Sequence, residues 1–331
     1  MRHAARLAAA TAFLAAIAYA FAPTAAIGAT PAPYPVRPVR LVVPFPPGGG
    51  ADTLARIVAP RMTEALGQTW VVDNRSGAAG NIAVEIVAKA APDGYTVLLT
   101  LNSVLTMNPG LYGNLPFDVQ RDLQPLTQLS SGMYVFLLHP SVPAATVKEL
   151  LDHTRTKPAG LSYASAGVGS PLHLATELLK SRTGVNLVHV PYKGGGPAVV
   201  ATIAGEAQVT FASIAASLQH VRNGRMKAIA VTGTRRAKAM PELPTMEEAG
   251  FPGFVVTSWH ALLVPARTPD AIVARLHREA HAVARQTAVL EAMAREGMET
   301  TTGLPADLGH LIRTETATWR EVIRTANIRA Q

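Results

Sequence analysis

Residues 39–54 read VRLVVPFPPGGGADTL, and this stretch decides the fold class. Val39 to Phe45 is a nearly continuous apolar run that predicts a buried strand, and three consecutive glycines follow it. Apolar residues recur at helical spacing from Leu54 to Leu66, and Gly67 supplies a stop. A strand, a glycine-rich turn and a helix in this order predict the first unit of a parallel α/β sheet.

The same alternation continues along the chain. Strands are expected at 69–73 and 95–100, with a helix over 81–90 between them. A second set of strands and helices runs from residue 134 to residue 231 and predicts a second, mostly parallel sheet. We expect two α/β lobes, joined by short crossing strands and facing one another across a cleft.

Helices are expected to dominate the last third of the chain. One long helix has Thr268 as its N-cap, Pro269 at its first position and Gly297 just past its end. A final helix runs from Pro305 to about Asn327. These helices are expected to cover the lobe with which the chain begins.

Composition excludes several classes of protein. The chain has 331 residues, 48% apolar and 16% charged, which is enough for about two domains and excludes a disordered chain. The absence of Cys excludes disulfides, a Cys-based zinc site and a thiol nucleophile. The chain has 30 basic and 22 acidic residues. The basic residues are scattered along the sequence and aromatics make up only 5%, so no nucleic-acid partner is expected.

The first 29 residues have the layout of a cleaved secretory signal peptide. Arg2 and Arg6 precede an apolar run of 16 residues, Leu7 to Ala22, and small residues up to Ala29 follow. This run is short for a membrane span, although an uncleaved anchor is the alternative. No later segment has 18 uninterrupted apolar residues, so the mature protein is expected to be soluble and exported.

Two glycine-rich loops occupy matching places, each between a strand and a helix. They are residues 45–53 and 165–173, and residues 191–197 and 74–80 form two further loops. Glycines let a ligand approach the backbone, and the helix N-terminus that follows presents unpaired N–H groups that suit an anion. A carboxylate shared by two lobes fits this chemistry, while an ordinary structural turn is the alternative for each loop.

Enzyme motifs are incomplete or absent. The chain has no Walker P-loop, no complete G-x-G-x-x-G and no G-x-S-x-G nucleophile elbow. His277 and His281 are spaced as helical metal ligands, but Glu279 is one place off the H-E-x-x-H register, which favours a surface helix. We expect neither a catalytic residue nor a metal or other cofactor.

Seven segments, in order through the mature chain, resemble the substrate-binding proteins of tripartite tricarboxylate transporters, the Bug family. They are PFPPGGGAD at 44–52, NRSGAAG at 74–80, PDGYT at 92–96, NPGLY at 108–112, SAGVGSPLH at 165–173, VPYKGGGPA at 190–198 and PTMEEAGFPGF at 244–254. Two places depart from the family pattern. Ala79 stands where many members have Gly, and Gln208 stands where many have Asp.

The resemblance implies a periplasmic receptor of the two-lobed, type II periplasmic-binding-protein (Venus-flytrap) fold. Residues 30–127 and 255–331 would form lobe 1, and residues 128–254 lobe 2. The ligand would be a small carboxylate (a di- or tricarboxylate, an aromatic acid or an amino acid), delivered by a monomeric receptor to membrane permease subunits. The ligand-binding residues carried over from the family are Phe45, Gly48, Gly49, Gly50, Ala51, Asp52, Thr53, Ser103, Ser165, Ala166, Gly167, Gly169, Ser170 and His173.

Two rival functions remain open at this stage. A receptor of the same fold could signal to a membrane kinase instead of feeding a permease. An exported serine-type hydrolase could use Ser103, Ser165 or Ser170 with a histidine across the cleft, although the missing elbow motif argues against it.

Overall fold

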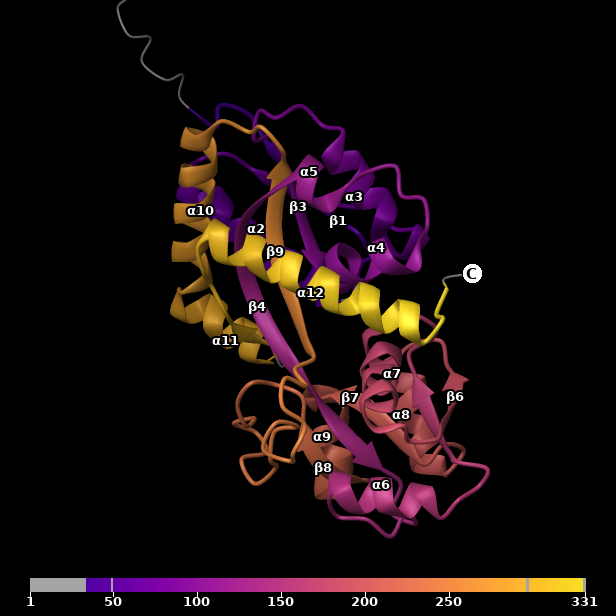
Figure 1. Ribbon diagram of the computed structural model, residues 1–331. Helices are drawn as coiled ribbons and strands as arrows, with labels where there is room; N and C mark the ends of the chain where they lie inside the picture. Colours follow the sequence, from indigo (N-terminus) through magenta and orange to yellow (C-terminus); the bar gives the residue numbers. More distant parts are fainter. Residues whose placement is uncertain (1–33, 49, 296–297, 330–331) are drawn as a thin grey trace, which may run out of the picture. The chain divides into compact units, whose positions relative to one another are not determined.

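Two antiparallel strands, β4 (Leu123–Leu138) and β9 (Thr257–Pro265), form the middle of the sheet and connect its two halves (Figure 1). The computed structural model describes residues 34–48, 50–295 and 298–329. The predicted signal peptide, Gly49 and Gly297 lie outside the described residues. Residues Arg37–Gln331 form one compact unit, separate from Met1–Val36, and the following concerns this unit alone.

The first half of the sheet contains the predicted parallel strands. β1 pairs in parallel with β2 on one side and β3 on the other, and β9 joins β3 in the antiparallel sense. Four of the five β1 residues are fully buried, as expected for a strand covered on both faces. The elements of this half are β1 (Val39–Val43), α2 (Gly50–Leu66), β2 (Trp70–Asn74), η1 (Ala78–Gly80), α3 (Asn81–Ala88), β3 (Thr96–Leu101), η2 (Ser103–Met107), α4 (Asn108–Leu111) and α5 (Val119–Asp122).

The second half repeats the α/β pattern beyond β4. Strand β7 pairs antiparallel with β4 and parallel with β5, and β6 lies at the edge, giving the order β2-β1-β3-β9-β4-β7-β5-β6. Among the described strands, β8 pairs with β4, in the antiparallel sense, and its last residue also forms an isolated parallel bridge to Thr245, so it is not hydrogen-bonded into the parallel set. The elements are α6 (Val147–Arg155), β5 (Leu161–Ser165), α7 (Pro171–Thr183), β6 (Leu187–Pro191), α8 (Gly195–Ala204), β7 (Val209–Ser213), α9 (Ile214–Arg222) and β8 (Lys227–Val231).

Strand β4 is much longer than the sequence predicts, because it begins at Leu123 and not near Tyr134. Its first part carries hydroxyl side chains that resemble a loop, yet two of them are buried and hydrogen-bonded. The Thr127 hydroxyl donates to the Gly303 carbonyl, and Ser130 pairs with a histidine on β9. Satisfied hydroxyls of this kind are compatible with a buried strand.

The expected long helix of the last third is two helices, α10 (Asp270–Ala284) and α11 (Thr287–Arg295). Arg285 and Gln286 donate to carbonyls three residues back, which closes the last turn of α10 tightly. The predicted N-cap is also wrong, since the Thr268 hydroxyl donates to the Pro265 carbonyl and the helix begins at Asp270. The short strand β10 (Glu299–Thr300) then pairs with β4.

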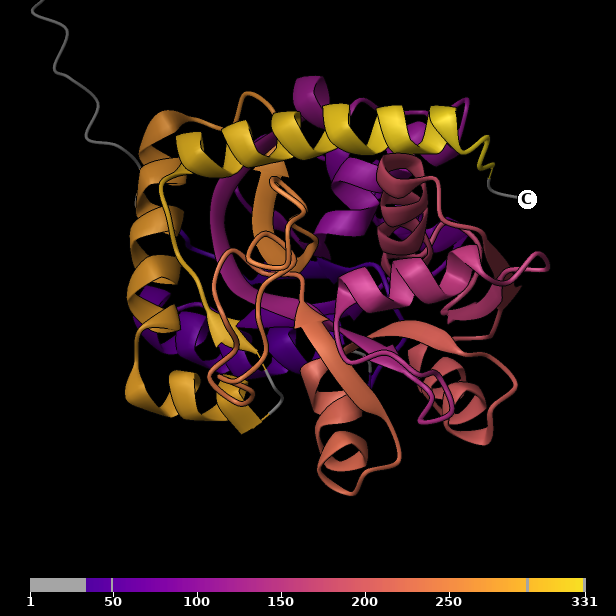
Figure 2. The same ribbon diagram turned by 60° about the horizontal axis from the view of Figure 1, so that its bottom comes forward.

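The final helix, α12 (Pro305–Thr325), packs against both halves of the unit. Leu308 and Ile312 belong to the core beneath β3 and β9, whereas Trp319 and Ile323 belong to the core around α7. Figures 1 and 2 both show α12 crossing from α10 towards α7. Because α12 packs against both halves, these contacts do not assign it to one lobe, and the lobe boundaries at residues 127/128 and 254/255 stay a prediction. None of the helices between residues 34 and 329 that are described is long and apolar enough to span a membrane.

The loop before α3 contains left-handed residues that are not glycine. Ala78 has φ 46° and Ala79 has φ 52°, between Gly77 and Gly80, whose φ values are also positive. A left-handed conformation costs an L-residue about 1–2 kcal/mol, which glycine avoids. The departure from the family pattern at Ala79 therefore places strain in this loop.

We predict that Ala79→Gly raises the free energy of unfolding by roughly 0.5–1 kcal/mol, since relief of strain exceeds the added chain entropy of glycine. Urea denaturation at pH 7 measures the change. Gly80→Ala is the contrasting variant and should destabilise the protein, because its Cβ would lie 3.0 Å from Pro44 Cβ and Val104 Cγ2 at a φ of 94°. A urea midpoint for Ala79→Gly below that of the wild type would contradict the claim that Ala79 is strained.

Candidate functional site

The first glycine-rich loop is held in place by Asp52, in the first turn of α2. Its side chain is 2% exposed and accepts hydrogen bonds from the Gly48 N–H, Asn74 Nδ2 and Arg56 Nε at 2.9–3.0 Å. Asn74 Nδ2 also donates to the Phe45 carbonyl. The hydrogen bond from Arg56, supported by those from Gly48 and Asn74 and opposed by burial, lowers the pKa of Asp52 to about 2. Asp52 thus anchors the loop through all of these bonds.

The remaining described residues of this loop lie at the start of α2. Gly50 is exposed at the helix N-terminus, Ala51 is buried and Thr53 is half-buried. A Cβ added to Gly50 would lie 4.0 Å from Nε2 of His260, on β9. The first loop therefore faces the middle strands of the sheet.

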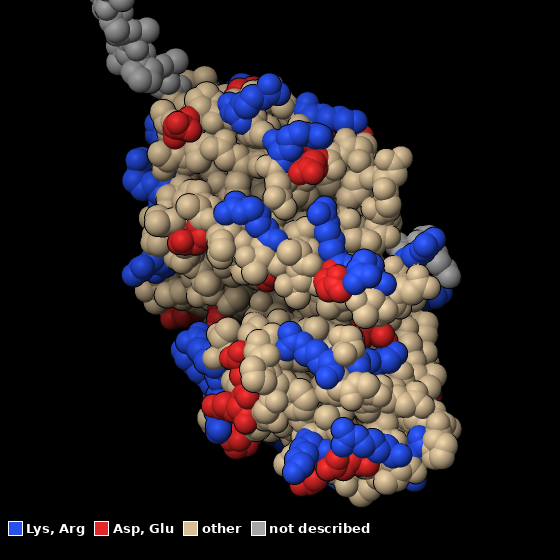
Figure 3. Space-filling model, viewed as in Figure 1, with Lys and Arg blue, Asp and Glu red and all other residues tan. Residues whose placement is uncertain are grey.

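A cavity of about 640 Å³ opens beside these strands. Figure 3 shows the surface hollowed here, with basic and acidic side chains together at its lower edge. The lining residues come from β4, β9, the start of α9, the loop after β8, and the segment from α11 to β10. They are Ser130–Tyr134, Thr257, Ser258, His260, Ser213–Ala215, Gly233–Arg235, Lys238, Ala239, Leu290, Ala294 and Met298–Thr300.

The floor of the cavity carries a serine–histidine pair. Ser130 and His260 lie opposite each other in the β4–β9 register, and Ser130 Oγ is 2.9 Å from His260 Nδ1. Both residues are buried, and His260 Nε2 has no hydrogen-bond partner among the residues that the structure describes. Burial lowers the pKa of His260 to about 4, so the imidazole is neutral at pH 7.

One wall of the cavity is the N-terminus of α9. Ser213 caps this helix by accepting a hydrogen bond from the Ala216 N–H, while Ile214 and Ala215 line the cavity. The unpaired N–H groups of a helix N-terminus favour an anion. The sequence analysis did not identify this helix N-terminus, because Ser213 and Ile214 are not flanked by glycines. The local signal for it is a serine that directly follows an apolar strand.

The charged residues at the cavity have a net positive balance. Arg235 pairs with Glu299 at 2.5 Å, which joins the loop after β8 to β10. Lys238 forms no ion pair with the described residues and is exposed. One uncompensated positive charge beside a helix N-terminus suits an acidic ligand.

The second glycine-rich loop is held by bonds within its own lobe. Ser165 is fully buried, and its hydroxyl is 2.6 Å from His189 Nε2 and 3.1 Å from both the N–H and carbonyl of Gly167. Ser170 caps α7 by accepting from the His173 N–H. A fully buried hydroxyl with these partners is a poor nucleophile for the hydrolase that we considered.

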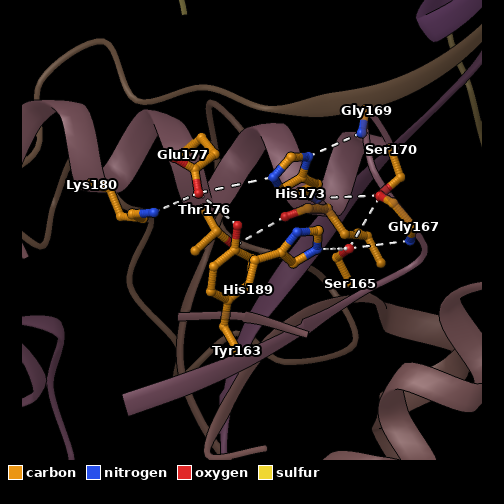
Figure 4. A network of polar contacts seen from close by, with 11 residues as sticks. Tyr163, Ser165, Gly167, Gly169, Ser170, His173, Thr176, Glu177, Lys180 and His189 are labelled. Atoms are coloured by element: carbon orange, nitrogen blue, oxygen red, sulfur yellow. Dashed lines mark hydrogen bonds and ion pairs between the residues drawn. The ribbon is translucent and has the colours of Figure 1, made fainter. Parts of the chain in front are cut away.

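Two stacked imidazoles support this loop (Figure 4). His173 and His189 have ring centroids 4.0 Å apart, and His173 Nδ1 accepts a hydrogen bond from the Gly169 N–H at 3.0 Å. Below them, Tyr163 donates to Glu177 at 2.6 Å, and Lys180 pairs with the same carboxylate. Burial, and secondarily the neighbouring His189, lowers the pKa of His173 to about 4.

The structure therefore divides the predicted site residues into two groups. Phe45, Gly48 and Gly50–Thr53 surround the start of α2, where a Cβ added to Gly50 would lie 4.0 Å from His260 Nε2. Gly169 lies instead against Leu111 of α4, and no described residue of 45–53 or of 165–173 lines the cavity. Ligand contacts by the residues of the first loop and by Ser165, Ala166, Gly167, Gly169, Ser170 and His173 stay a prediction, as do those of Gly49 and of Ser103, which is half-buried at the start of η2.

Gln208 lies away from the cavity. Its Oε1 accepts hydrogen bonds from the N–H and hydroxyl of Ser162 at 2.9 Å, which ties the starts of β7 and β5 together. This departure from the family pattern has a structural use here, and Gln208 does not line the cavity.

We predict that Asp52→Ala lowers the free energy of unfolding by about 1 kcal/mol at pH 7, because the loop and the first turn of α2 lose their common acceptor. The folded pKa lies below the ordinary value of 3.8, so this contribution is complete above pH 3.8 and is lost as the pH falls towards 2. Urea unfolding at pH 7 and pH 2.5 checks both points. Glu64→Ala, at an exposed pair on the same helix, should change little; equal effects of the two variants at pH 7 would contradict the anchor.

The lowered pKa of His173 predicts a second way in which the stability of the fold depends on pH. An unfolded histidine takes up its proton near pH 6.5 and the folded one near pH 4, so its contribution to stability is complete above pH 6.5 and is lost as the pH falls towards 4. His173→Asn keeps an acceptor for the Gly169 N–H but does not titrate. The drop in melting temperature between pH 7.5 and pH 5 should be smaller in this variant than in the wild type, and an identical drop would exclude His173 as a source.

Comparison with known proteins places this geometry in a family. The model of the tripartite tricarboxylate transporter family receptor matches residues 54–328. Three solved structures of similar sequence cover 88–90% of this chain and 99–100% of their own. They are a protein of R. palustris with adipate (35% identity, TM-score 0.75), the periplasmic binding protein BugD (33%, 0.72) and MatC of Rhodopseudomonas palustris with bound malate (31%, 0.72).

These matches confirm the two-lobed α/β fold of periplasmic binding proteins that the sequence predicts. They also confirm the family that the seven sequence segments indicate, since the matched region spans both halves of the sheet. The chain belongs to the receptor family of the tripartite tricarboxylate transporters.

Proposed function

We propose that the protein is a periplasmic receptor that binds a small organic acid in the cavity beside β4 and β9 and delivers it to the permease subunits of a tripartite transporter. The observation that carries the proposal is the N-terminus of α9, through Ile214 and Ala215, in the wall of a cavity with an uncompensated lysine. Relatives of this chain were solved with adipate and malate, which are both dicarboxylates.

The chemistry of the lining supports an acid over a neutral or cationic ligand. Hydroxyl groups come from Ser131 and Ser258, and N–H groups from the start of α9. Such neutral donors can hold a carboxylate with little fixed charge nearby, because hydrogen bonds to an ionised acceptor are strong in a partly buried site. Glu299, the acidic lining residue, is already paired with Arg235.

The position of the cavity supports capture by closure. Its lining combines the crossing strands with α11 and β10 on one side and with the loop after β8 and the start of α9 on the other. Arg235 and Glu299 join these two sides, but both are exposed, so the pair is worth little and can open. A ligand that contacts both sides favours the closed state by its differential affinity.

The receptor would be exported, and it would release its ligand chemically unchanged. The predicted signal peptide, residues 1–29, would direct the chain to the periplasm, where a monomeric receptor meets the permease. We infer no catalytic role: Ser165 is buried, the Ser130–His260 pair uses Nδ1, and no carboxylate of the described residues bonds to Nε2 as one does to a catalytic histidine.

The test is a thermal-shift screen on the protein purified from the periplasm, unfolded in denaturant and refolded to remove any bound ligand. The panel is malate, succinate, adipate, citrate, glutamate and benzoate, with succinamide and glucose as neutral controls. An acid at about 100 times its Kd should stabilise the fold by roughly 2.7 kcal/mol, a shift of a few degrees. Calorimetric titration of each acid that shifts the melting temperature gives its Kd. Stabilisation by the neutral compounds alone would overturn the proposal.

A further inference from the structure

His260 occupies a position where strand periodicity expects an apolar side chain. Alternate residues of β9 point to opposite faces of the sheet, and Trp259, Ala261 and Leu263 belong to the core on one face. His260 therefore faces the other way, as does Ser130, its cross-strand partner on β4. An imidazole in this strand is more than nine-tenths buried, with 7% of its surface exposed.

One ring nitrogen of His260 has no partner among the described residues. Nδ1 is 2.9 Å from Ser130 Oγ, but Nε2 is buried and makes no hydrogen bond within that part of the chain. Leaving a buried polar group unpaired is costly, and few such groups occur in native proteins. Because His260 also lines the cavity, its Nε2 is available to pair with a molecule bound there.

The surroundings of Nε2 indicate an acceptor. Gly50, the first residue of α2, lies close to Nε2, so the N–H groups of a 17-residue helix begin beside it. Gly50 has no side chain to fill the space between the helix start and the imidazole. A negatively charged oxygen placed there would accept hydrogen bonds from both the ring and the helix N-terminus.

Ser130 is the partner of the other ring nitrogen. The only side-chain bond of its hydroxyl among the described residues is to His260 Nδ1, and in the tautomer that carries its hydrogen on Nε2 this hydroxyl donates to Nδ1. Because burial depresses the pKa of the ring, it is a neutral donor at pH 7. The same ring would then bind an anion without a fixed positive charge.

We propose that His260 is a ligand-binding residue, which donates Nε2–H to a carboxylate oxygen of the bound organic acid while the Ser130 hydroxyl donates to Nδ1. The second oxygen of that carboxylate lies towards the start of α2. This inference rests on the proposed function, since it assigns one end of the ligand to a defined place in the same cavity. The acid is held end-on, with its carboxylate at the floor and its remainder directed towards Met133 and Leu290.

Two substitutions at position 260 separate binding from structure. His260→Phe keeps the ring and removes both nitrogens, and we expect it to weaken binding at least tenfold, as for the loss of a hydrogen bond to a charged group. His260→Gln places an amide N–H near the position of Nε2 and should retain binding within about threefold of wild type. Ser130→Ala, which removes the partner of Nδ1, should fall between the two. His310→Phe, at an exposed histidine of α12, is the matched control and should bind as wild type does.

The probes are malate, adipate, succinate, citrate, glutamate and benzoate, each titrated by calorimetry into refolded protein, with the melting temperature of the ligand-free variants measured in parallel. A ligand-binding His260 predicts that ligand-free His260→Phe melts at or above the wild-type temperature, because an unpaired polar group has been removed, although its affinity is lost. A lower melting temperature with unchanged affinity would assign His260 a structural role.

The outcomes distinguish this inference from the proposed function. If wild type and His260→Phe bind an acid of the panel equally, Nε2 is paired by water only and this inference is overturned, while the receptor function stands. If wild type binds none of the acids, the proposed function is overturned, and the assignment of His260 falls with it. A tenfold loss in His260→Phe with retention in His260→Gln supports both.

Discussion

The antiparallel pairing of β4 and β9 is the interaction on which the rest of the structure depends. The two strands pair from Leu123 and Pro265 to Met133 and Thr257, and β4 then continues into the second half of the sheet. Their register places Ser130 opposite His260, and a slip of one residue would move His260 to the apolar face. The connection between the two halves of the sheet and the position of the Ser130–His260 pair thus both depend on the hydrogen bonds between β4 and β9.

Buried polar side chains fix where these strands begin to cross. Asn102 donates to the Thr257 carbonyl, and Glu315 of α12 accepts from Trp259 Nε1 and Thr106 Oγ1. Burial raises the pKa of Glu315, and the hydrogen bonds from its neutral donors oppose this shift. Like the network under the second loop, this cluster uses its hydrogen bonds to hold backbone in place, and it leaves binding to groups that have no internal partner.

Much of the fold was predictable because strands and helices that pack on one core carry local periodic signals. Strands β2 and β3, expected at 69–73 and 95–100, were predicted correctly to within one residue, since an apolar run depends on neighbours in sequence. The first half of β4 was not, because its buried hydroxyls are satisfied by Gly303 and His260, far away in the chain. The break between α10 and α11 likewise has no glycine or proline to announce it.

By itself, the sequence determined the α/β class, the family and the two glycine-rich loops, because these are written in local patterns and in the order of motifs. Only the tertiary structure decided which polar atoms are already used and which remain available. The side chains of Ser165, His173 and Asp52 are engaged by their own loops, whereas His260, a single histidine in an apolar strand, keeps Nε2 unpaired beside the cavity. The reason is physical: a hydrogen bond between strands 130 residues apart cannot be read from either strand alone.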